Sequence, residues 1–231
     1  MKEIPVSPLP TVLIPGYFAS AREYLSLAHD LEQLGVATTV VPLGYRSWLP
    51  TLGGKPVTPV LEIIAQTITE TCARYGTTQV NLVGHSAGGW IARLLLGEQD
   101  YMGRVWGRFA QVHTLVTLGT PHLSQERFTR TNMDFVNTSY PGAFQQGVRY
   151  VCVAGRAVSG LDDWFARQSY RLTCGQADCW GDGITPIAAA HLRGAENLVL
   201  EGVWHSPRRQ RQWYGSPAVL GQWVGYLDCT L

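Results

Sequence analysis

Short apolar runs alternate with longer amphipathic segments along most of the chain. Val12-Leu13-Ile14 stops at Pro15-Gly16, which predicts a short buried strand. A capping-box pattern then begins at Ser20, and apolar residues recur every three or four positions as far as Leu34. We therefore expect a helix over this segment, ending before Gly35.

The same two patterns continue through the rest of the chain. Apolar and β-branched runs predict further strands, and apolar stripes predict further helices, with a short one opening at Thr185-Pro186. The predicted strands span 12–14, 36–41, 79–83, 112–118, 148–154 and 197–201. The predicted helices span 20–34, 58–75, 89–96 and 218–227. Segments 43–57, 122–147 and 155–181 lack a clear period and are expected to be irregular.

Strands and helices alternate almost one by one. This order favours a mostly parallel central sheet with helices on both faces. No internal repeat and no long linker divides the chain. We therefore predict a single α/β domain over residues 1–231, with 122–147 as an insertion in it.

Composition narrows the classes of function. The 231 residues are 45% hydrophobic and 15% charged, which is enough apolar material for a core and excludes disorder for most of the chain. The formal net charge of +1 gives no field that would attract nucleic acid, so no nucleic-acid partner is expected. No apolar run of about eighteen residues predicts a membrane span, and residues 1–10 lack the apolar centre of a signal peptide. We expect a cytoplasmic protein, and its oligomeric state stays open.

The strongest chemical motif is Gly84-His85-Ser86-Ala87-Gly88, which matches G-x-S-x-G between a predicted strand and a predicted helix. In that context the serine stands on a sharp turn, and the start of the helix faces developing negative charge. Gly84 and Gly88 leave space where a Cβ would clash. Ser86 is therefore the candidate nucleophile, with a glycine turn and a serine helix cap as the alternative. We expect His85 to pack or to form hydrogen bonds locally.

A serine nucleophile needs a base that takes its proton and an acid that orients the base. On an elbow of this kind, the acid and then the histidine follow the serine along the chain. His205 follows the last predicted strand, so it lies at the edge of the sheet where ligands bind. It is the candidate base. His122 and His191 also follow Ser86, but His191 is better explained as a polar residue on a helix.

The candidate acid is Asp182. Glycines on both sides of it fit a turn that aims a carboxylate. Asp162 and Asp163 are the alternatives, although negative charge at a helix start explains both of them more simply.

Two backbone N–H groups are expected to stabilise the oxyanion of acyl transfer. Ala87, the residue after the nucleophile, supplies one of them. Tyr17, in the loop after the first strand, supplies the other, with Phe18 as the alternative. An ordinary Pro-Gly turn would explain the same loop.

Taken in order, five parts of the chain resemble the α/β-hydrolase superfamily. The likeness is nearest to lipases and esterases, including proteins similar to the catalytic domain of the GPI inositol-deacylase and the lipase-like hydrolases of cyanobacteria and plastids. The five parts are Ile14–Phe18, Gly84–Gly89, Leu118–Pro121, Gly181–Pro186 and His205. The chain departs from many lipases at Pro15, where they have a histidine.

The resemblance implies the α/β-hydrolase fold and a carboxylic ester as substrate, with a lipid ester expected. It implies an acyl-enzyme on Ser86, with His205 as base, Asp182 as acid and the oxyanion hole at Tyr17 and Ala87. It implies no metal and no organic cofactor. A thioesterase or an acyltransferase with the same residues is the alternative. A non-catalytic binding scaffold is a third, which the complete serine, aspartate and histidine set disfavours.

Residues 122–147 lie where α/β hydrolases often carry a cap. We predict a lid over a hydrophobic acyl pocket, and a structural insertion that packs its aromatic residues against the core is the alternative. Six apolar residues stand among polar ones in this segment: Phe128, Met133, Phe135, Val136, Tyr140 and Phe144.

Two further patterns stay open. Arg208, Arg209 and Arg211 follow the candidate base, and either contact anionic lipid headgroups at a membrane surface or form a solvated rim. Cys174 and Cys179 suggest zinc or a disulfide. A second ligand pair at zinc spacing is missing, so loop packing is the preferred explanation.

Overall fold

A computed structural model describes residues 9–206 and 211–227. Six strands form its central sheet: β1 (Thr11–Ile14), β2 (Thr38–Val40), β3 (Val80–His85), β4 (Val112–Leu118), β5 (Arg149–Arg156) and β8 (Glu196–Glu201). Their order across the sheet is β2-β1-β3-β4-β5-β8, and every neighbouring pair is parallel. The predicted parallel sheet is thereby confirmed.

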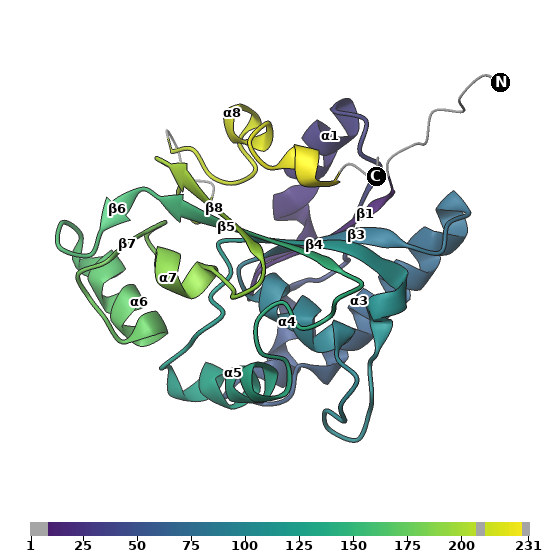
Figure 1. Cartoon of the computed structure of the whole chain (residues 1–231), viewed down its shortest axis with the longest axis horizontal. Helices are drawn as coiled ribbons and strands as arrows, with labels where there is room; N and C mark the ends of the chain where they lie inside the picture. The colour runs from purple at the N-terminus through teal and green to yellow at the C-terminus, as the bar shows by residue number, and fades with distance from the viewer. Residues whose placement is uncertain (1–8, 207–210, 228–231) are drawn as a thin grey trace.

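Helices cover both faces of this sheet (Figure 1). The four helices that do so are α1 (Leu25–Gln33), α3 (Thr58–Tyr75), α4 (Ala87–Leu96) and α8 (Pro217–Leu220). One face carries α1 and α8, and the opposite face carries α3 and α4. Among residues 9–206 and 211–227, no helix is both long and apolar enough to cross a membrane.

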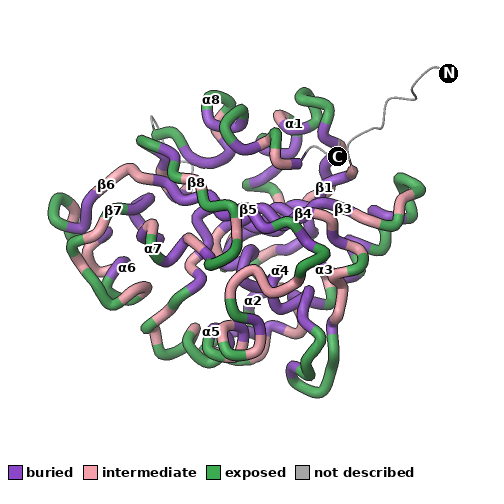
Figure 2. Tube along the Cα trace, in the orientation of Figure 1, coloured by how far each residue is buried: buried purple, intermediate pink, exposed green. Residues whose placement is uncertain are grey.

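Side-chain alternation along the strands creates two separate cores. On β1, Val12 and Ile14 belong to the core under α3 and α4, whereas Leu13 belongs to the core under α1 and α8. On β3, Leu82 and Val83 divide in the same way. Figure 2 shows the buried residues concentrated along the sheet and on the inward sides of the helices. Short apolar runs therefore form these strands because both of their faces are covered.

The first predicted helix is divided in two. A 3-10 helix η1 (Ala21–Tyr24) begins at the predicted capping box and leads into α1. The last predicted helix is divided as well, into α8 and η4 (Val224–Leu227), because α8 ends at Gly221. The sequence predicts the helical character of each segment but not the change from 3-10 to α-helix or from α- to 3-10 helix within it.

Segments predicted to be irregular contain regular elements, which corrects the sequence prediction. Between residues 43 and 57 lie α2 (Tyr45–Trp48) and η2 (Leu49–Thr51), held by the buried indole of Trp48, which donates to the Ala19 carbonyl at 3.1 Å. Because one buried tryptophan holds this short segment, the sequence has no periodic apolar stripe there from which the helix could be predicted.

The two longer segments each contain an amphipathic helix with one mostly polar face. Residues 122–147 hold α5, and residues 155–181 hold α6 between two short antiparallel strands. The elements not yet given are η3 (Arg108–Gln111), α5 (Arg127–Ser139), β6 (Val158–Ser159), α6 (Trp164–Cys174), β7 (Trp180–Gly181) and α7 (Ile187–Ala190). Glu126 caps α5 and Asp163 caps α6, each accepting backbone N–H groups of the first turn.

Candidate active site

The G-x-S-x-G motif forms a sharp turn between β3 and α4. Ser86 has φ 52° and ψ −125°, a conformation that is strained for any residue with a Cβ. A Cβ added to Gly84 would lie 2.6 Å from the Gly89 Cα, and one added to Gly88 would lie 2.6 Å from the Ile14 carbonyl oxygen. The backbone can therefore turn this tightly only with glycine at both positions, as the sequence predicts.

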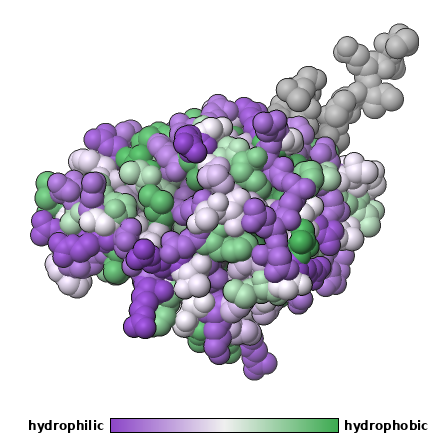
Figure 3. All heavy atoms as spheres, turned by 60° about the horizontal axis from the view of Figure 1, so that its bottom comes forward, coloured by the Kyte–Doolittle hydropathy of each residue, from purple (hydrophilic) through white to green (hydrophobic). Residues whose placement is uncertain are grey.

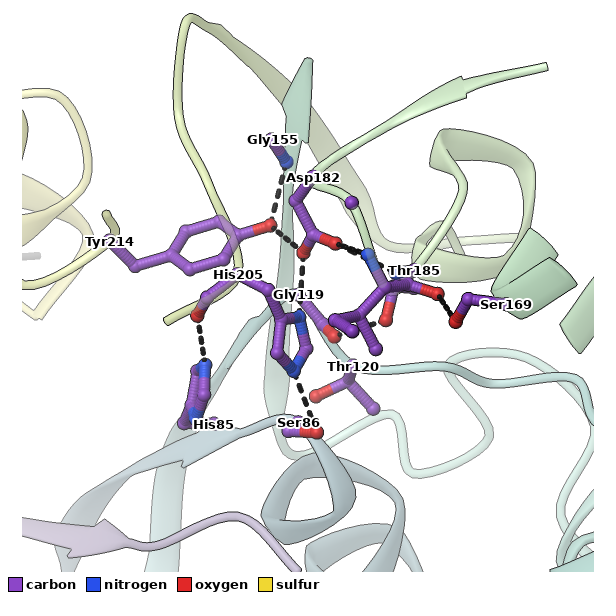
Figure 4. Close-up of polar contacts among 12 residues, drawn as sticks. His85, Ser86, Gly119, Thr120, Gly155, Ser169, Asp182, Thr185, His205 and Tyr214 are labelled. Atoms are coloured by element: carbon purple, nitrogen blue, oxygen red, sulfur yellow. Dashed lines mark hydrogen bonds and ion pairs between the residues drawn. The ribbon is translucent and has the colours of Figure 1, made fainter. Parts of the chain in front are cut away.

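Ser86, His205 and Asp182 lie in hydrogen-bond contact, although they come from distant parts of the chain (Figure 4). The Ser86 Oγ lies 3.0 Å from the His205 Nε2, and the His205 Nδ1 lies 2.8 Å from the Asp182 Oδ2. The loop after β8 carries the histidine, and the turn after β7 carries the aspartate. The Asp182 side chain is fully buried and the His205 side chain almost so. The structure thus brings the three predicted residues together.

Four donors hold the Asp182 carboxylate. Its Oδ1 accepts the backbone N–H groups of Ile184 and Thr185, at 2.9 and 2.7 Å. Its Oδ2 accepts the Tyr214 hydroxyl at 2.7 Å and faces the His205 Nδ1. Both carboxylate oxygens therefore have hydrogen-bond partners in their buried place. With Oδ2 as its acceptor, the Nδ1 of His205 carries the ring proton, which leaves Nε2 free to accept from Ser86.

Tyr214 is a hydrogen-bond partner of Asp182 that sequence reasoning missed. Its ring is buried, and its hydroxyl accepts the Gly155 N–H at 2.7 Å while donating to Asp182. A Cβ on Gly119 would collide with both the Asp182 Oδ2 and the Tyr214 ring, which shows how closely this corner is packed. The sequence indicates this contact only by placing a tyrosine nine positions after the candidate base.

We expect Tyr214→Phe to lower the free energy of unfolding by about 1–3 kcal/mol, because both the Gly155 N–H and the Asp182 carboxylate lose a buried partner. Urea unfolding measures this difference. Tyr75→Phe, at an exposed tyrosine at the end of α3, is the matched control and is expected to change the free energy by less than about 0.5 kcal/mol. Equal effects of the two substitutions would contradict this explanation.

The rival candidates lie in other surroundings. His122 is buried against Arg93, and His191 contacts the Leu198 carbonyl through Nε2 at 3.3 Å. Asp163 accepts the Ala166 N–H at 2.7 Å as the cap of α6, and Asp162 is exposed beside it. The helix-start explanation therefore fits Asp163, and neither carboxylate is a hydrogen-bond partner of His205.

His85 joins three loops of the site rather than bonding only locally. Its Nε2 lies 2.8 Å from the His205 carbonyl, which can only accept, so Nε2 carries the proton. Its Nδ1 therefore accepts the hydroxyl of Tyr24 at 2.7 Å, and that hydroxyl accepts the Gly16 N–H at 3.0 Å. The chain Gly16–Tyr24–His85–His205 thus fastens the loop after β1 and the loop after β8 to the elbow.

Two buried histidines make stability depend on pH. Burial, and then the nearby His205 ring, lower the pKa of His85 to about 3. Burial, and then Arg93, hold the pKa of His122 well below its usual range. An unfolded histidine titrates near pH 6.5, so the unfolded chain binds more protons below that pH. The folded state therefore loses stability as the pH falls.

We expect the free energy of unfolding to fall below about pH 6.5 by about 1.4 kcal/mol per pH unit for each buried histidine. Urea unfolding at about pH 7 and about pH 5 measures the slope. His85→Gln is expected to show a shallower slope than the native chain, whereas His29→Gln, at an exposed histidine of α1, keeps the native slope. An unchanged slope in His85→Gln would refute the assignment of a neutral, buried imidazole.

The loop after β1 lies directly against Ser86, the candidate nucleophile. A Cβ added to Gly16 would lie 3.0 Å from the Ser86 Cβ, and Phe18 adopts a positive φ of 57°. Within the described residues, the backbone N–H groups of Tyr17, Phe18 and Ala87 form no hydrogen bond with the protein. They are available to an oxyanion, and Tyr17 and Phe18 stay alternatives for the second donor.

A cleft of about 380 Å³ opens beside Ser86. Its wall is mixed. Apolar surface comes from Tyr17, Phe18, Ile184 and Trp213, whereas polar groups, including those of Glu23 and Ser206, make up the larger share of the exposed lining. A smaller hollow of about 180 Å³ lies on the other side of His205 and is bounded by Phe165, Trp204 and Arg211, among others. The candidate base therefore stands between two recesses.

The predicted lid segment does not reach this cleft. Among the described residues that line it, none comes from 122–147. Met133, Val136 and Tyr140 are buried in the core, Phe135 and Phe144 pack against it, and only Phe128 is exposed. On the α5 side of the molecule, hydrophobic residues are scattered among hydrophilic ones (Figure 3). These contacts favour the structural insertion, and the lid stays a prediction that depends on Phe128.

The structure describes only one of the three arginines that follow the candidate base, and it offers no metal cluster around the two cysteines in its described part. Arg208 and Arg209 lie outside the described residues. Arg211 stacks on the Trp204 ring at 3.7 Å from its centroid, at the edge of the smaller hollow. In the described part of the chain, no three histidine, cysteine or acidic residues cluster as metal ligands would.

A parallel sheet with a strained serine between β3 and α4 is the architecture of the α/β-hydrolase fold, and this chain has that fold. The product of the gene lin2722 of Listeria innocua shares it, with a TM-score of 0.57 and 15% identity over 97% of this chain and 95% of that chain. A protein of Xanthomonas campestris, described as a candidate hydrolase of the α/β superfamily, has a TM-score of 0.49 and 16% identity over 95% and 93%.

Residues 52–146 match the family model described as PGAP1-like alpha/beta domain. An esterase of Exiguobacterium antarcticum is similar over 54% of this chain and 43% of its own, with 23% identity and a TM-score of 0.33. A comparison with curated proteins gave no match. The parallel sheet and the likeness to the Listeria innocua protein confirm the resemblance to α/β hydrolases for the fold.

Proposed function

We propose that this protein is a serine hydrolase of carboxylic esters, with Ser86 as nucleophile, His205 as general base and Asp182 as the acid that orients it. One observation carries the proposal: the hydrogen-bonded series Ser86–His205–Asp182, with distances of 3.0 and 2.8 Å, starting on a strained elbow. The Ser86 side chain forms no capping hydrogen bond with α4, so capping does not explain the strained serine at this position. Contact with an oriented imidazole suits it to nucleophilic attack.

The reaction begins when His205 Nε2 takes the proton of the Ser86 hydroxyl as the oxygen attacks the ester carbonyl. Negative charge then develops on the carbonyl oxygen, facing the N–H of Ala87 and that of Tyr17 or Phe18. His205 returns the proton to the departing alcohol and leaves an acyl group on Ser86. Water, deprotonated by His205, releases the acid in the second half of the reaction.

The ring surface on one part of the cleft wall supports an apolar acyl chain as the group bound there. Tyr17, Phe18 and Trp213 offer ring surface beside Ser86, and an aliphatic chain leaves water when it packs against them. Each buried methylene contributes about 0.8 kcal/mol, which equals about a fourfold gain in kcat/KM. A lipid ester is the substrate class that uses this surface best.

We therefore expect kcat/KM for p-nitrophenyl esters to rise about fourfold per methylene from acetate upward, until the chain fills the cleft. Initial rates from acetate to palmitate measure this, with Ser86→Ala as the blank. The matching acyl thioesters, and ester reactions with an added acceptor alcohol, separate hydrolysis of esters from thioesterase and acyltransferase activity. A maximum at acetate would refute the lipid part of the proposal, and the absence of Ser86-dependent turnover would refute the hydrolase itself.

A further inference from the structure

Two thiols face each other on the turn that joins α6 to β7. Cys174 is the last residue of α6, Cys179 immediately precedes β7, and their Sγ atoms are 3.9 Å apart. Both Sγ atoms also lie near the Gln176 carbonyl, at 3.7 and 3.8 Å. Both side chains are half-buried on a surface turn, so small reagents can reach them. Cys72 and Cys152, in contrast, are buried in the core.

Backbone hydrogen bonds hold the chain beside both cysteines. Next to Cys174, the Gly175 N–H donates to the Arg171 carbonyl at 3.0 Å. The Gly160 N–H donates to the Cys179 carbonyl at 2.9 Å, and Trp180 pairs with Ser159 in the β6–β7 ribbon. The turn between Cys174 and Cys179 packs closely against Gly160, because a Cβ there would collide with the Ala177 carbonyl oxygen. The two sulfur atoms therefore face each other because the fold holds them there. A disulfide requires the two sulfur atoms to approach to about 2.05 Å.

We propose that Cys174 and Cys179 are a reversible disulfide site, oxidised by exchange with an external disulfide. Burial, and then the neighbouring Cys174, raise the pKa of Cys179 to about 11, so its thiolate is scarce at neutral pH. The thiolate of one cysteine displaces one thiolate from the external disulfide, and the sulfur of the other cysteine then displaces the second. Two protein thiols are oxidised and one external disulfide is reduced to two thiols.

This bond would tie together the two elements that hold the candidate acid. From α6, the Ser169 hydroxyl donates to the Ile184 carbonyl at 2.7 Å (Figure 4). The Tyr170 hydroxyl, also on α6, accepts the Gly183 N–H at 2.9 Å. From the other side, β7 leads directly into Asp182. A bond between Cys174 and Cys179 links the end of α6 covalently to the start of β7, next to the turn that carries Asp182. It restricts the unfolded chain more than the folded one.

The test compares the full chain, folded and unfolded in urea, in the same glutathione buffer. One tryptic peptide, residues 172–193, contains both cysteines and no other. Its mass without reductant therefore reports the bond as a loss of two hydrogen atoms. We expect the equilibrium constant for this loss to be about 30-fold larger in the folded chain. We expect the Tm of the oxidised protein to be about 4–8 °C above that of the reduced protein.

Cys174→Ser and Cys179→Ser are the control variants, and the Tm of each is expected to be independent of the glutathione ratio. Three results would overturn the proposal: equal oxidation of the folded and the unfolded chain, two glutathiones bound separately to the peptide, or a bond from it to another peptide. The readouts are mass and Tm, so the result does not depend on whether Ser86 is a nucleophile.

Discussion

Ser86→Ala is expected to lower kcat toward the best ester substrate by about 10⁴–10⁶-fold. Without the hydroxyl no acyl-enzyme forms, and His205 has no proton to take from a nucleophile. The remaining turnover comes from the backbone donors and from binding in the cleft. Alanine retains the Cβ, so the strained turn and its packing against Gly16 stay as they are. The free energy of unfolding is accordingly expected to change by less than about 1 kcal/mol.

Steady-state kinetics and urea unfolding of the same preparations check this prediction. Ser26→Ala, at an exposed serine of α1, is the matched control and is expected to keep the native kcat. A fluorophosphonate probe provides a second readout, because it labels an activated serine without needing the right substrate. Native kcat in Ser86→Ala, or labelling of that variant at the native rate, would exclude Ser86 as the nucleophile.

Asp182→Asn is expected to lower kcat by about 10⁴-fold through the proton of His205. The N–H groups of Ile184 and Thr185 point at Oδ1, so the amide oxygen of asparagine occupies that position. Its NH2 group then replaces Oδ2 and faces His205 Nδ1. A donor there forces Nδ1 to accept, which moves the imidazole proton to Nε2. Nε2 can then no longer accept the proton of Ser86.

The pH dependence distinguishes this effect from a general disturbance of the site. The asparagine variant is expected to gain activity as the pH rises, because hydroxide can replace the disabled base, while its KM stays near the native value. Asp162→Asn, at the exposed rival on the same side of the molecule, is expected to keep kcat within about twofold. Equal kcat values for the two variants would contradict the role of Asp182.

Local sequence was sufficient for the sheet and for the elbow. The strands are short apolar runs that end at proline, glycine or polar residues, and Ser86 stands between one of them and a helix with a regular stripe. The order serine, aspartate, histidine then predicted which loops meet, because loops at the same ends of parallel strands are neighbours. His205 and Asp182 lie where that argument puts them.

The parts that sequence reasoning missed depend on tertiary contacts. Tyr214 supports Asp182 through a hydroxyl group that comes from 32 positions away in the chain. Tyr24 contacts His85, which lies 61 positions away in the chain. No local sequence pattern predicts the Tyr214–Asp182 contact or the Tyr24–His85 contact. The helices α5 and α6 were missed for another reason. Each has one narrow buried face, with few apolar residues in the segment to reveal it.

The strand order also determines when the site exists during folding. β1, from the beginning of the described chain, lies between β2 and β3, and the last strand closes the opposite edge. The contact between His85 and the His205 carbonyl spans 120 residues. Such contacts form only after the loop between them has closed, which is slow compared with the formation of single helices. Reactivity of Ser86 should therefore return last on refolding, after helical circular dichroism has recovered, and it can serve as a clock for the completion of the native sheet.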